Sequence, residues 1–278
     1  MFTYALYRKF ELMGVEACVD LSFYDGIVST KYVLEDVFPS INPKRDTEHD
    51  CPRLRNAYAS RNIIEKIVQK VNAQKKSVWY ERNPIEFTKK VFRAKDCCME
   101  GFWQSDKYWL DVKNDIISDF TFADINDDGI NKLLDFINGN SVCSVHVRGG
   151  DYLDAENKAM FGGICTPNYY KKAMEYITSI DKNVKFLVFT NDKEYCSSFL
   201  SAYDTVEASD YLVGLPDWVD MMLMSKCKYN ITANSTFSWW GAYLNQTPDA
   251  VVIAPDTWIN GNGAQDIWPK DWIRIEGN

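Results

Sequence analysis

The chain has 278 residues, of which 46% are hydrophobic and 25% are charged, so it carries enough apolar material for a packed core and is not a disordered tail. At roughly 150 residues per domain, this length predicts two domains or one large one. The net charge is −8, and the 11 basic and 17 acidic residues after residue 140 place most of it in the second half. Nucleic acid is not an expected partner, because its phosphate backbone needs clustered Lys and Arg.

The cysteines do not form a metal-binding pattern. Eight cysteines include no C-x-x-C pair, and only two histidines accompany them, which argues against a zinc cluster. The first ten residues predict an amphipathic helix and lack the apolar stretch of a signal peptide, so we expect reduced cysteines in a cytoplasmic protein. The N-x-Ser/Thr sequons at Asn230, Asn234 and Asn245 are then not expected to be glycosylated. No apolar run is long enough to span a membrane.

The predicted elements of the first half are irregular. Apolar residues from Phe2 to Met13 recur at helical spacing, and Gly14 can close this helix in the left-handed conformation. A polar stretch over 38–52 contains three prolines and predicts a loop. The remaining elements expected here are strands over 17–21 and 77–80 and helical segments over 63–71, 108–120 and 130–137.

From residue 141 onward, strands and helices alternate regularly. Such an alternation, with strands that are apolar on both faces, predicts a parallel, doubly wound sheet. Ligands of these sheets bind at the carboxyl ends of the strands, so the residues after each strand are the first candidates for a site. We expect strands over 141–147, 184–190, 205–208, 228–232 and 250–254, and helices over 167–180, 194–200, 216–226 and 236–243, with Thr166 as an N-cap.

A polar turn follows the first of these strands. His146 and Arg148 alternate with valines, so both side chains leave the same face of the strand end. Glycines at 149 and 150 let a ligand or another backbone come close. The planar, always-charged guanidinium of Arg148 suits a phosphate or diphosphate. The alternative is a purely structural glycine turn in which Arg148 pairs with Asp151.

Two further strands end in polar residues. Asn234–Thr236 lie where a helix begins, so backbone N–H groups, hydroxyls and the positive end of the helix dipole converge on an anion site there. The alternative is that Asn234 or Ser235 is only an N-cap and that Trp239 and Trp240 belong to the core, which we favour for the tryptophans. Asp192, after the strand over 184–190, can accept two N–H bonds from a guanine or cap the next helix.

These motifs, in this order, resemble the bacterial alpha-1,2-fucosyltransferases of glycosyltransferase family 11. The resemblance covers nearly the whole chain. It implies an α/β, GT-B-like fold in which two Rossmann-type domains face a cleft, with 1–139 on the acceptor side and 140–278 binding GDP-fucose. The motifs that carry it are M-F-T-Y-A at 1–5, G-F-W-Q-S-D-K-Y at 101–108, H-V-R-G-G-D-Y at 146–152, F-T-N-D at 189–192, D-M-M-L-M-S-K-C at 220–227 and N-S-T-F-S-W-W-G-A at 234–242.

The resemblance also implies a function. It implies inverting transfer of L-fucose from GDP-fucose to the O2 of a terminal galactoside, carried by an oligosaccharide or a lipid-linked glycan, in glycan, O-antigen or capsule synthesis. It implies no cofactor and no obligatory metal, and a cytoplasmic protein that can lie peripherally on the inner face of the membrane. Carried onto this sequence, the donor site would comprise Arg148, Ser235, Thr236 and Ser238 on the diphosphate, His146 and Asp192 on the guanosine, and Asn234 beside them.

The chain departs from the family pattern in two places. Gly149 stands where the family usually has a second arginine, so one possible phosphate contact is missing. Family members normally begin with an apolar strand and a glycine-rich turn before the Met-Phe-x-Tyr-Ala helix, and both are absent here. We therefore expect an incomplete first domain, which loses stability and puts activity in question because a missing central strand exposes backbone donors and apolar surface.

Inverting transfer needs charge relief on the departing GDP, a base for the acceptor hydroxyl and alignment of the two. No Asp-x-Asp motif occurs in the sequence, so Arg148 and the helix dipole are expected to stabilise the diphosphate in place of a metal. Asp151 is the base candidate nearest to the site in sequence. Asp154, Glu156 or a carboxylate of the first domain are equally plausible.

Other interpretations remain open. Asp124-x-Asn126-x-Asp128-Gly129 with Asp135 at the twelfth position matches a calcium loop, although a solvated loop and N-cap are preferred because Asp replaces the usual bidentate Glu. The competing functions are a lectin-like carbohydrate-binding protein, an inactive transferase and a GDP-sugar transferase of different linkage. The aromatic residues that would stack on an acceptor sugar, or else form core, with core preferred, are Trp79, Trp103 and Trp109.

Overall fold

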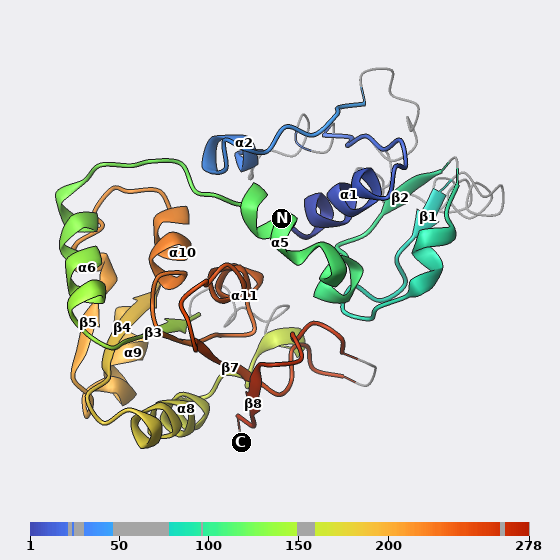
Figure 1. Ribbon diagram of the computed structural model, residues 1–278. Helices are drawn as coiled ribbons and strands as arrows, with labels where there is room; N and C mark the ends of the chain where they lie inside the picture. The colour runs from blue at the N-terminus through green and yellow to red at the C-terminus, as the bar shows by residue number, and fades with distance from the viewer. Residues whose placement is uncertain are drawn as a thin grey trace. The chain divides into compact units, whose positions relative to one another are not determined.

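The computed structural model describes residues 1–21, 24, 31–46, 78–95, 97–148, 159–261 and 265–277 (Figure 1). The chain divides into two compact units, the first comprising Met1–Ala123 and Ala264–Pro269 and the second Asp124–Gly263 and Lys270–Asn278. This division lies N-terminal to the expected domain boundary between 139 and 140, and a short segment near the C-terminus returns to the first unit. The predicted facing arrangement of two domains across a cleft stays a prediction.

Unit 1 opens with the predicted helix. Helix α1, Phe2–Leu12, buries its apolar face and ends at Gly14, whose φ is +75°. Val15 N donates to Phe10 O at 3.0 Å and Gly14 N to Glu11 O at 2.8 Å, which is the paired bonding of a Schellman motif. The left-handed conformation that this stop requires is available to glycine without strain.

The rest of unit 1 is built from short elements. The predicted strand over 17–21 is wrong, because only Val19 pairs, in a single bridge to Arg45. The predicted helix over 108–120 is broken into 3-10 turns and the short helix α5, while the helix expected over 63–71 lies outside the described residues. Strand β1 pairs in parallel with β2, which was not predicted. The described elements of unit 1 after α1 are α2 Leu34–Val37, β1 Val78–Tyr80, η2 Lys89–Arg93, β2 Cys98–Glu100, η3 Asp106–Tyr108, η4 Leu110–Val112 and α5 Lys113–Asp119.

Aromatic side chains make most of the core of unit 1. Trp103 and Trp109 are 1% and 0% exposed, so they are core residues and not stacking platforms, whereas Trp79 is half-buried.

The segment Ala264–Pro269, which belongs to unit 1, is held there by hydrogen bonds of Asp266. Its carboxylate accepts from Phe87 N at 2.9 Å and from Lys107 Nζ, and its carbonyl accepts from Ser105 Oγ at 2.5 Å.

The cysteines are mostly free thiols. Among the described residues, those that are not in a disulfide are Cys18, Cys97, Cys143, Cys165, Cys196 and Cys227. Cys98, the first residue of β2, is disulfide-bonded, so the expectation of wholly reduced cysteines is wrong at this position. Sequence spacing could not show this, because tertiary structure alone brings two thiols within bonding distance.

Unit 2 contains one six-stranded, wholly parallel sheet. Its strand order is β5-β4-β3-β6-β7-β8, which read along the chain is the 3-2-1-4-5-6 order of a Rossmann sheet. The predicted α/β class and doubly wound parallel sheet are therefore confirmed. The short edge strand β8 was not predicted. The strands are β3 Val142–Val147, β4 Lys185–Thr190, β5 Thr205–Glu207, β6 Tyr229–Ile231, β7 Val251–Pro255 and β8 Ile273–Ile275.

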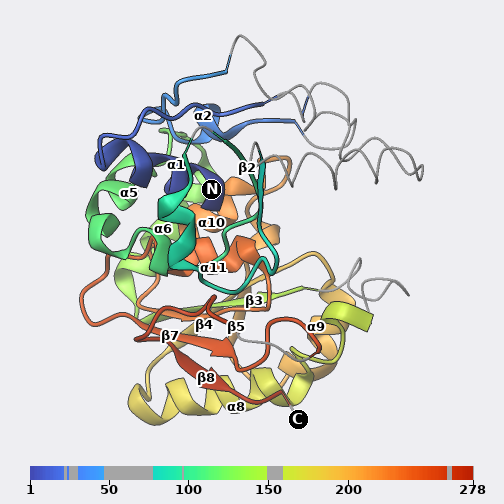
Figure 2. The same ribbon diagram turned by 90° about the vertical axis from the view of Figure 1, so that its right-hand side faces the viewer.

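Helices cover both faces of this sheet (Figure 2). Helices α8 and α9 pack their apolar residues against the valines of β3, and α10 and α11 lie with α6 on the opposite face. The predicted N-cap is present, since Thr166 Oγ1 accepts from Tyr169 N and Pro167 opens α8. The helices are α6 Asp128–Gly139, α8 Pro167–Ile180, α9 Lys193–Leu200, α10 Trp218–Met224 and α11 Thr236–Tyr243.

A buried polar network joins the two central strands. Asn230 of β6 is 1% exposed, and its Nδ2 donates to Ser144 Oγ of β3 and to Met224 O, both at 2.7 Å. Its Oδ1 accepts from Asn245 Nδ2 at 2.7 Å. These bonds fix β3 against β6 and bury the side-chain amide of Asn230, the first residue of one sequon.

Within the described residues, no helix is both long and apolar enough to cross a membrane.

Candidate functional site

The carboxyl ends of β3 and β6 lie next to each other at the centre of the unit 2 sheet. The two strands are hydrogen-bonded neighbours, with Val145 opposite Ile231. The chain leaves β3 toward α8 on one face and leaves β6 for α11 on the other, so the strand order reverses here. Doubly wound sheets bind their ligands at such a point. The two predicted motifs, around His146 and around Ser235, are thereby brought together.

His146 is a buried base without an internal partner for one nitrogen. It is 7% exposed, and its ring centroid lies 5.8 Å from that of Phe237 in the first turn of α11. Burial lowers the pKa of its imidazole to about 3, helped by the positive charge of Arg148. Nδ1 makes no hydrogen bond to any part of the chain that the structure describes. A neutral imidazole with an unsatisfied nitrogen is suited to pair with a polar group of a ligand.

Arg148 places a permanent cation beside this histidine. It directly follows β3 and is half-buried, and its charge lowers the pKa of the neighbouring imidazole. The next residues, 149–158, lie outside the described residues. The structure therefore places neither Gly149 nor the base candidates Asp151, Asp154 and Glu156, and the alternative in which Arg148 pairs with Asp151 stays untested.

The start of α11 is an uncapped helix N-terminus. Ser235 occupies the N-cap position, with φ −131° and ψ 127°, but its side chain makes no capping bond. Its carbonyl accepts the first helical bond, from Trp239 N at 3.0 Å. The N–H groups of Thr236 and the next two residues thus have no intrahelical acceptor, and they carry the positive end of the helix dipole. Backbone donors and a dipole of this kind suit an anion, and the anion site expected here stays a prediction.

Two predicted donor-site side chains are engaged within the protein. Asn234, 2% exposed, donates from Nδ2 to Phe161 O at 3.3 Å and Trp258 O at 3.2 Å, so it holds two loops beside the site. Ser238, also 2% exposed, donates its hydroxyl to carbonyls of the turn before α11, at 3.3 and 3.5 Å. Their contribution to a ligand site is the shape of the turn. The core placement of Trp239 and Trp240, 0% and 2% exposed, is confirmed.

Asp192 combines a structural and an open role. It follows β4, the neighbour of β3, and its Oδ1 accepts from Tyr195 N at 3.0 Å as the N-cap of α9. Its own N–H donates to Thr190 Oγ1 at 2.9 Å. The second carboxylate oxygen has no hydrogen bond within the described part of the chain, so it is available to a ligand at the same edge of the sheet.

The calcium loop suggested by the sequence does not form. Helix α6 begins at Asp128, so the last eight positions of the twelve-residue pattern, through Asp135, are helical and cannot wrap around an ion. Asp127 is the N-cap, accepting from Gly129 N at 2.8 Å and Ile130 N at 3.1 Å. The preferred interpretation, a loop followed by an N-cap, is confirmed. No group of three or more potential metal ligands occurs among the residues that the structure describes.

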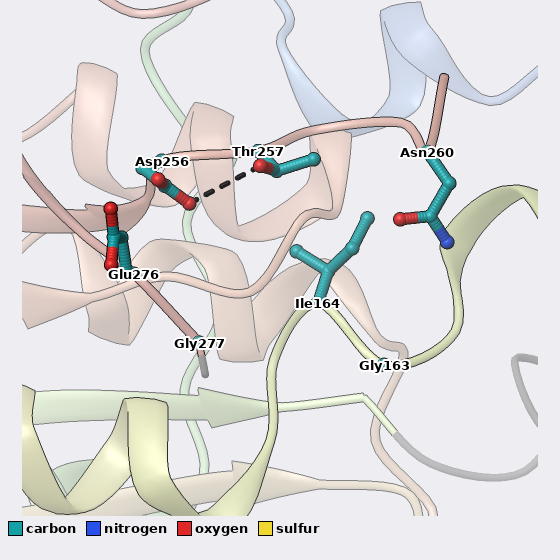
Figure 3. Close-up of a pocket in the computed structure, with 7 residues that line it drawn as sticks. All are labelled: Gly163, Ile164, Asp256, Thr257, Asn260, Glu276 and Gly277. Atoms are coloured by element: carbon teal, nitrogen blue, oxygen red, sulfur yellow. Dashed lines mark hydrogen bonds between the residues drawn. The ribbon is translucent and has the colours of Figure 1, made fainter.

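A second polar recess lies further along the same edge (Figure 3). It has a volume of about 180 Å³ and is lined by the side chains of Asp256, Thr257, Asn260 and Glu276. Asp256 directly follows β7 and Glu276 directly follows β8. Sequence reasoning missed this recess because β8 was not expected. The available signal was an acidic residue after each strand.

The family model of glycosyl transferase family 11 matches residues 54–276 of the chain, a span that contains the motifs at 101–108, 146–152 and 234–242. The chain belongs to glycosyl transferase family 11. The resemblance inferred from the motifs is thus confirmed.

Individual relatives agree with this assignment. An alpha-1,2-colitosyltransferase of Escherichia coli is 35% identical over 69% of this chain and 67% of its own length. The O-antigen biosynthesis glycosyltransferase WbnK of Escherichia coli is 33% identical over 64% of this chain and 60% of its own length. A galactoside alpha-(1,2)-fucosyltransferase 1 of Leontopithecus chrysomelas is 29% identical over 65% and 53%. The chain thus spans between about half and two thirds of these relatives.

Proposed function

We propose that this family 11 enzyme transfers L-fucose from GDP-fucose to the O2 of a terminal galactoside, with inversion. The observation that carries the proposal is that Arg148 and the uncapped N-terminus of α11 follow two paired strands, β3 and β6, at the switch point of the sheet. The guanidinium is a cation, and the helix N-terminus carries N–H donors and a partial positive charge, so together they fit a diphosphate. The alpha-1,2 linkage is supported by the names of two relatives, one a colitosyltransferase and the other a fucosyltransferase.

In this mechanism the chain's own charges stabilise the leaving group. Negative charge builds up on the departing GDP, and the guanidinium of Arg148 and the N–H groups of Thr236 and its neighbours would stabilise that charge. No obligatory metal is then required, in keeping with the lack of an Asp-x-Asp motif. Asp151 is our candidate for the base that takes the proton of the acceptor hydroxyl, with Asp154 and Glu156 as alternatives.

The guanosine would lie against β3 and β4. His146 offers its unpaired Nδ1, and Asp192 offers the carboxylate oxygen that does not cap α9. A carboxylate oxygen accepts the N–H groups that distinguish guanine from adenine, so Asp192 would supply base selectivity. The burial that keeps His146 neutral favours an uncharged partner such as a base or ribose.

The proposed acceptor is a galactose-terminated oligosaccharide or a lipid-linked glycan. Similarity to an O-antigen biosynthesis glycosyltransferase supports a bacterial surface glycan. A lipid-linked acceptor would bring the enzyme to the inner face of the membrane as a peripheral protein.

A second candidate is transfer of a different GDP-linked sugar. It is favoured by the 35% identity to a colitosyltransferase, since colitose differs from L-fucose by the loss of one hydroxyl group. The same nucleotide site would serve both donors. Parallel assays with the two sugar nucleotides decide between them.

The test is a calorimetric titration of GDP into the full chain in buffer with EDTA, with UDP and ADP as controls. We expect GDP to bind selectively and without metal, and GDP-fucose then to be consumed in the presence of a galactoside. A folded sample that binds none of the nucleotides would contradict the proposal. It would favour a lectin-like protein or an inactive relative.

A further inference from the structure

The recess at the ends of β7 and β8, here the β7–β8 pocket, lies at the same carboxyl edge of the sheet as the proposed nucleotide site. The sheet runs β3, β6, β7, β8 in space, and each strand is about 5 Å from the next. The pocket therefore begins one strand away from the N-terminus of α11, where the diphosphate is proposed to bind. In a sugar nucleotide the sugar is bonded directly to the distal phosphate, so the sugar ring lies about one strand spacing away from that phosphate.

The pocket presents hydrogen-bond acceptors. The carboxylates of Asp256 and Glu276 line it, and Thr257 Oγ1 donates to Asp256 Oδ1 at 3.2 Å (Figure 3). The Asn260 Nδ2 is held by Gly162 O at 2.9 Å, so the amide orientation is fixed. Figure 3 shows the amide oxygen turned toward Ile164. Such a lining suits a ligand that brings many O–H donors.

The charge of the lining decides which part of a ligand enters. Two carboxylates repel a phosphate, so the diphosphate is kept on the cationic side, at Arg148 and α11. The pocket's volume of about 180 Å³ is on the scale of a single pyranose ring. An uncharged sugar with several hydroxyl groups fits both the volume and the charge.

The pocket wall is fixed by backbone packing. A Cβ on Gly277 would lie 1.9 Å from Ile164 O, so only glycine allows the two segments to approach so closely. Thr166 Oγ1, at the start of α8, donates to Gly277 O, and Asp256 N donates to Ile275 O at 3.0 Å. The backbone that carries Asp256 and Glu276 is thus held in place before any ligand arrives.

Building on the proposed function, we infer that the β7–β8 pocket binds the sugar ring of the GDP-sugar donor, and that Asp256 and Glu276 accept hydrogen bonds from its hydroxyl groups. The pocket is then what distinguishes the sugar nucleotide from free GDP. It also reads the hydroxyl pattern that separates one deoxysugar donor from another.

The experiment compares GDP and GDP-fucose, in separate calorimetric titrations, for the unmodified protein and the variants Asp256→Asn and Glu276→Gln. We expect the Kd of GDP-fucose to rise about tenfold in each variant while the Kd of GDP stays unchanged. Asp249→Asn is the matched control, since it makes the same change at an exposed residue near the opposite end of β7. It should leave both affinities unchanged.

Several outcomes would overturn the inference. An equal loss of affinity for GDP and GDP-fucose in the variants, or no loss for either, would show that the pocket does not contact the sugar. Loss of galactoside binding alone, measured with lactose, would assign the pocket to the acceptor. Calcium binding in the unmodified protein that both substitutions abolish would assign it to a cation. Failure of the unmodified protein to bind GDP would instead overturn the proposed function from which the inference starts.

Discussion

The residues at the carboxyl edge of the unit 2 sheet differ in whether their polar atoms are hydrogen-bonded within the chain. Asn234 and Ser238 donate hydrogen bonds to backbone carbonyls, whereas His146 has a buried nitrogen without a hydrogen bond and Ser235 makes no capping bond. Unpaired buried groups cost stability, and they collect at functional sites where a ligand completes them. The residues that pair least within the chain are accordingly the stronger candidates for direct ligand contact.

Replacing Arg148 tests the proposed charge relief. Arg148→Ala should reduce transfer about a hundredfold or more, because a cation directed at the leaving group is removed, while far-UV circular dichroism stays unchanged. The transfer rate of Arg148→Lys should lie between those of the unmodified protein and the alanine variant, since lysine keeps the charge but lacks the planar guanidinium. Turnover above a tenth of the unmodified rate in the alanine variant would contradict the role.

Replacing His146 separates stability from binding. Burial holds the pKa of His146 at about 3, below its ordinary 6.5, so on acidification the unfolded state takes up a proton that the folded state refuses. The stabilising contribution is present above pH 6.5 and is lost as the pH falls toward 3. His146→Phe should flatten this part of the stability profile without lowering stability at pH 7, and should weaken GDP binding about tenfold. An unchanged pH profile in urea unfolding would contradict the neutral, buried histidine.

At the scale of elements, the caps explain where helices begin and which beginnings remain open. Thr166 caps α8, Asp127 caps α6 and Asp192 caps α9, each by accepting backbone N–H bonds, whereas α11 alone among these four has a serine that caps nothing. Because α11 follows the central strand β6, its open end faces the switch point. A helix with a satisfied N-terminus there would bind an anion less well.

This contrast gives a paired prediction. Asp127→Ala should cost about 1 kcal/mol of unfolding free energy, because two N–H groups of α6 lose their acceptor. Ser235→Ala should cost less than about 0.5 kcal/mol, because no capping bond is lost, yet it should weaken GDP binding. Denaturant titration and calorimetry of both variants check the pair. An equal stability loss would mean that Ser235 is an ordinary cap.

At the scale of the whole molecule, the chain is divided into two units whose sequence segments interleave. The segment Ala264–Pro269 belongs to unit 1 although the chain before and after it belongs to unit 2. Asp266 makes this return possible through its bonds to Phe87 N, Ser105 Oγ and Lys107 Nζ. The proposed nucleotide site, by contrast, is built from unit 2 residues only.

Asp266→Ala should therefore act on unit 1 alone. We expect a loss of about 1 kcal/mol or more, because Phe87 N loses its acceptor, with no change in the Kd of GDP. Lys107→Ala is the matched control and should cost less, because it removes only a partly exposed ion pair. Thermal unfolding with and without GDP checks both. A weaker GDP affinity in the aspartate variant would show that the two units are coupled.

Features that depend on neighbours along the chain could be predicted from the sequence. Alternating apolar runs and helical periodicity specified the strands and helices of unit 2 from Val142 to Pro255, and the cap residue Thr166 specified where α8 starts, because both signals act within a few residues. The motifs at His146 and Ser235 were visible for the same reason: they directly follow predicted strands.

Features that depend on partners far apart in the sequence could not be predicted and became visible in the folded chain. The three-residue strands β2 and β8 carry too little pattern to be predicted and exist because a neighbouring strand is there to pair with them. The same holds for the return of Asp266 to unit 1 and for the pocket formed by Asp256 and Glu276, which are adjacent only because β7 and β8 are paired. Pairing across a sheet is set by burial and backbone hydrogen bonding over the whole unit, and these are not encoded in any one segment.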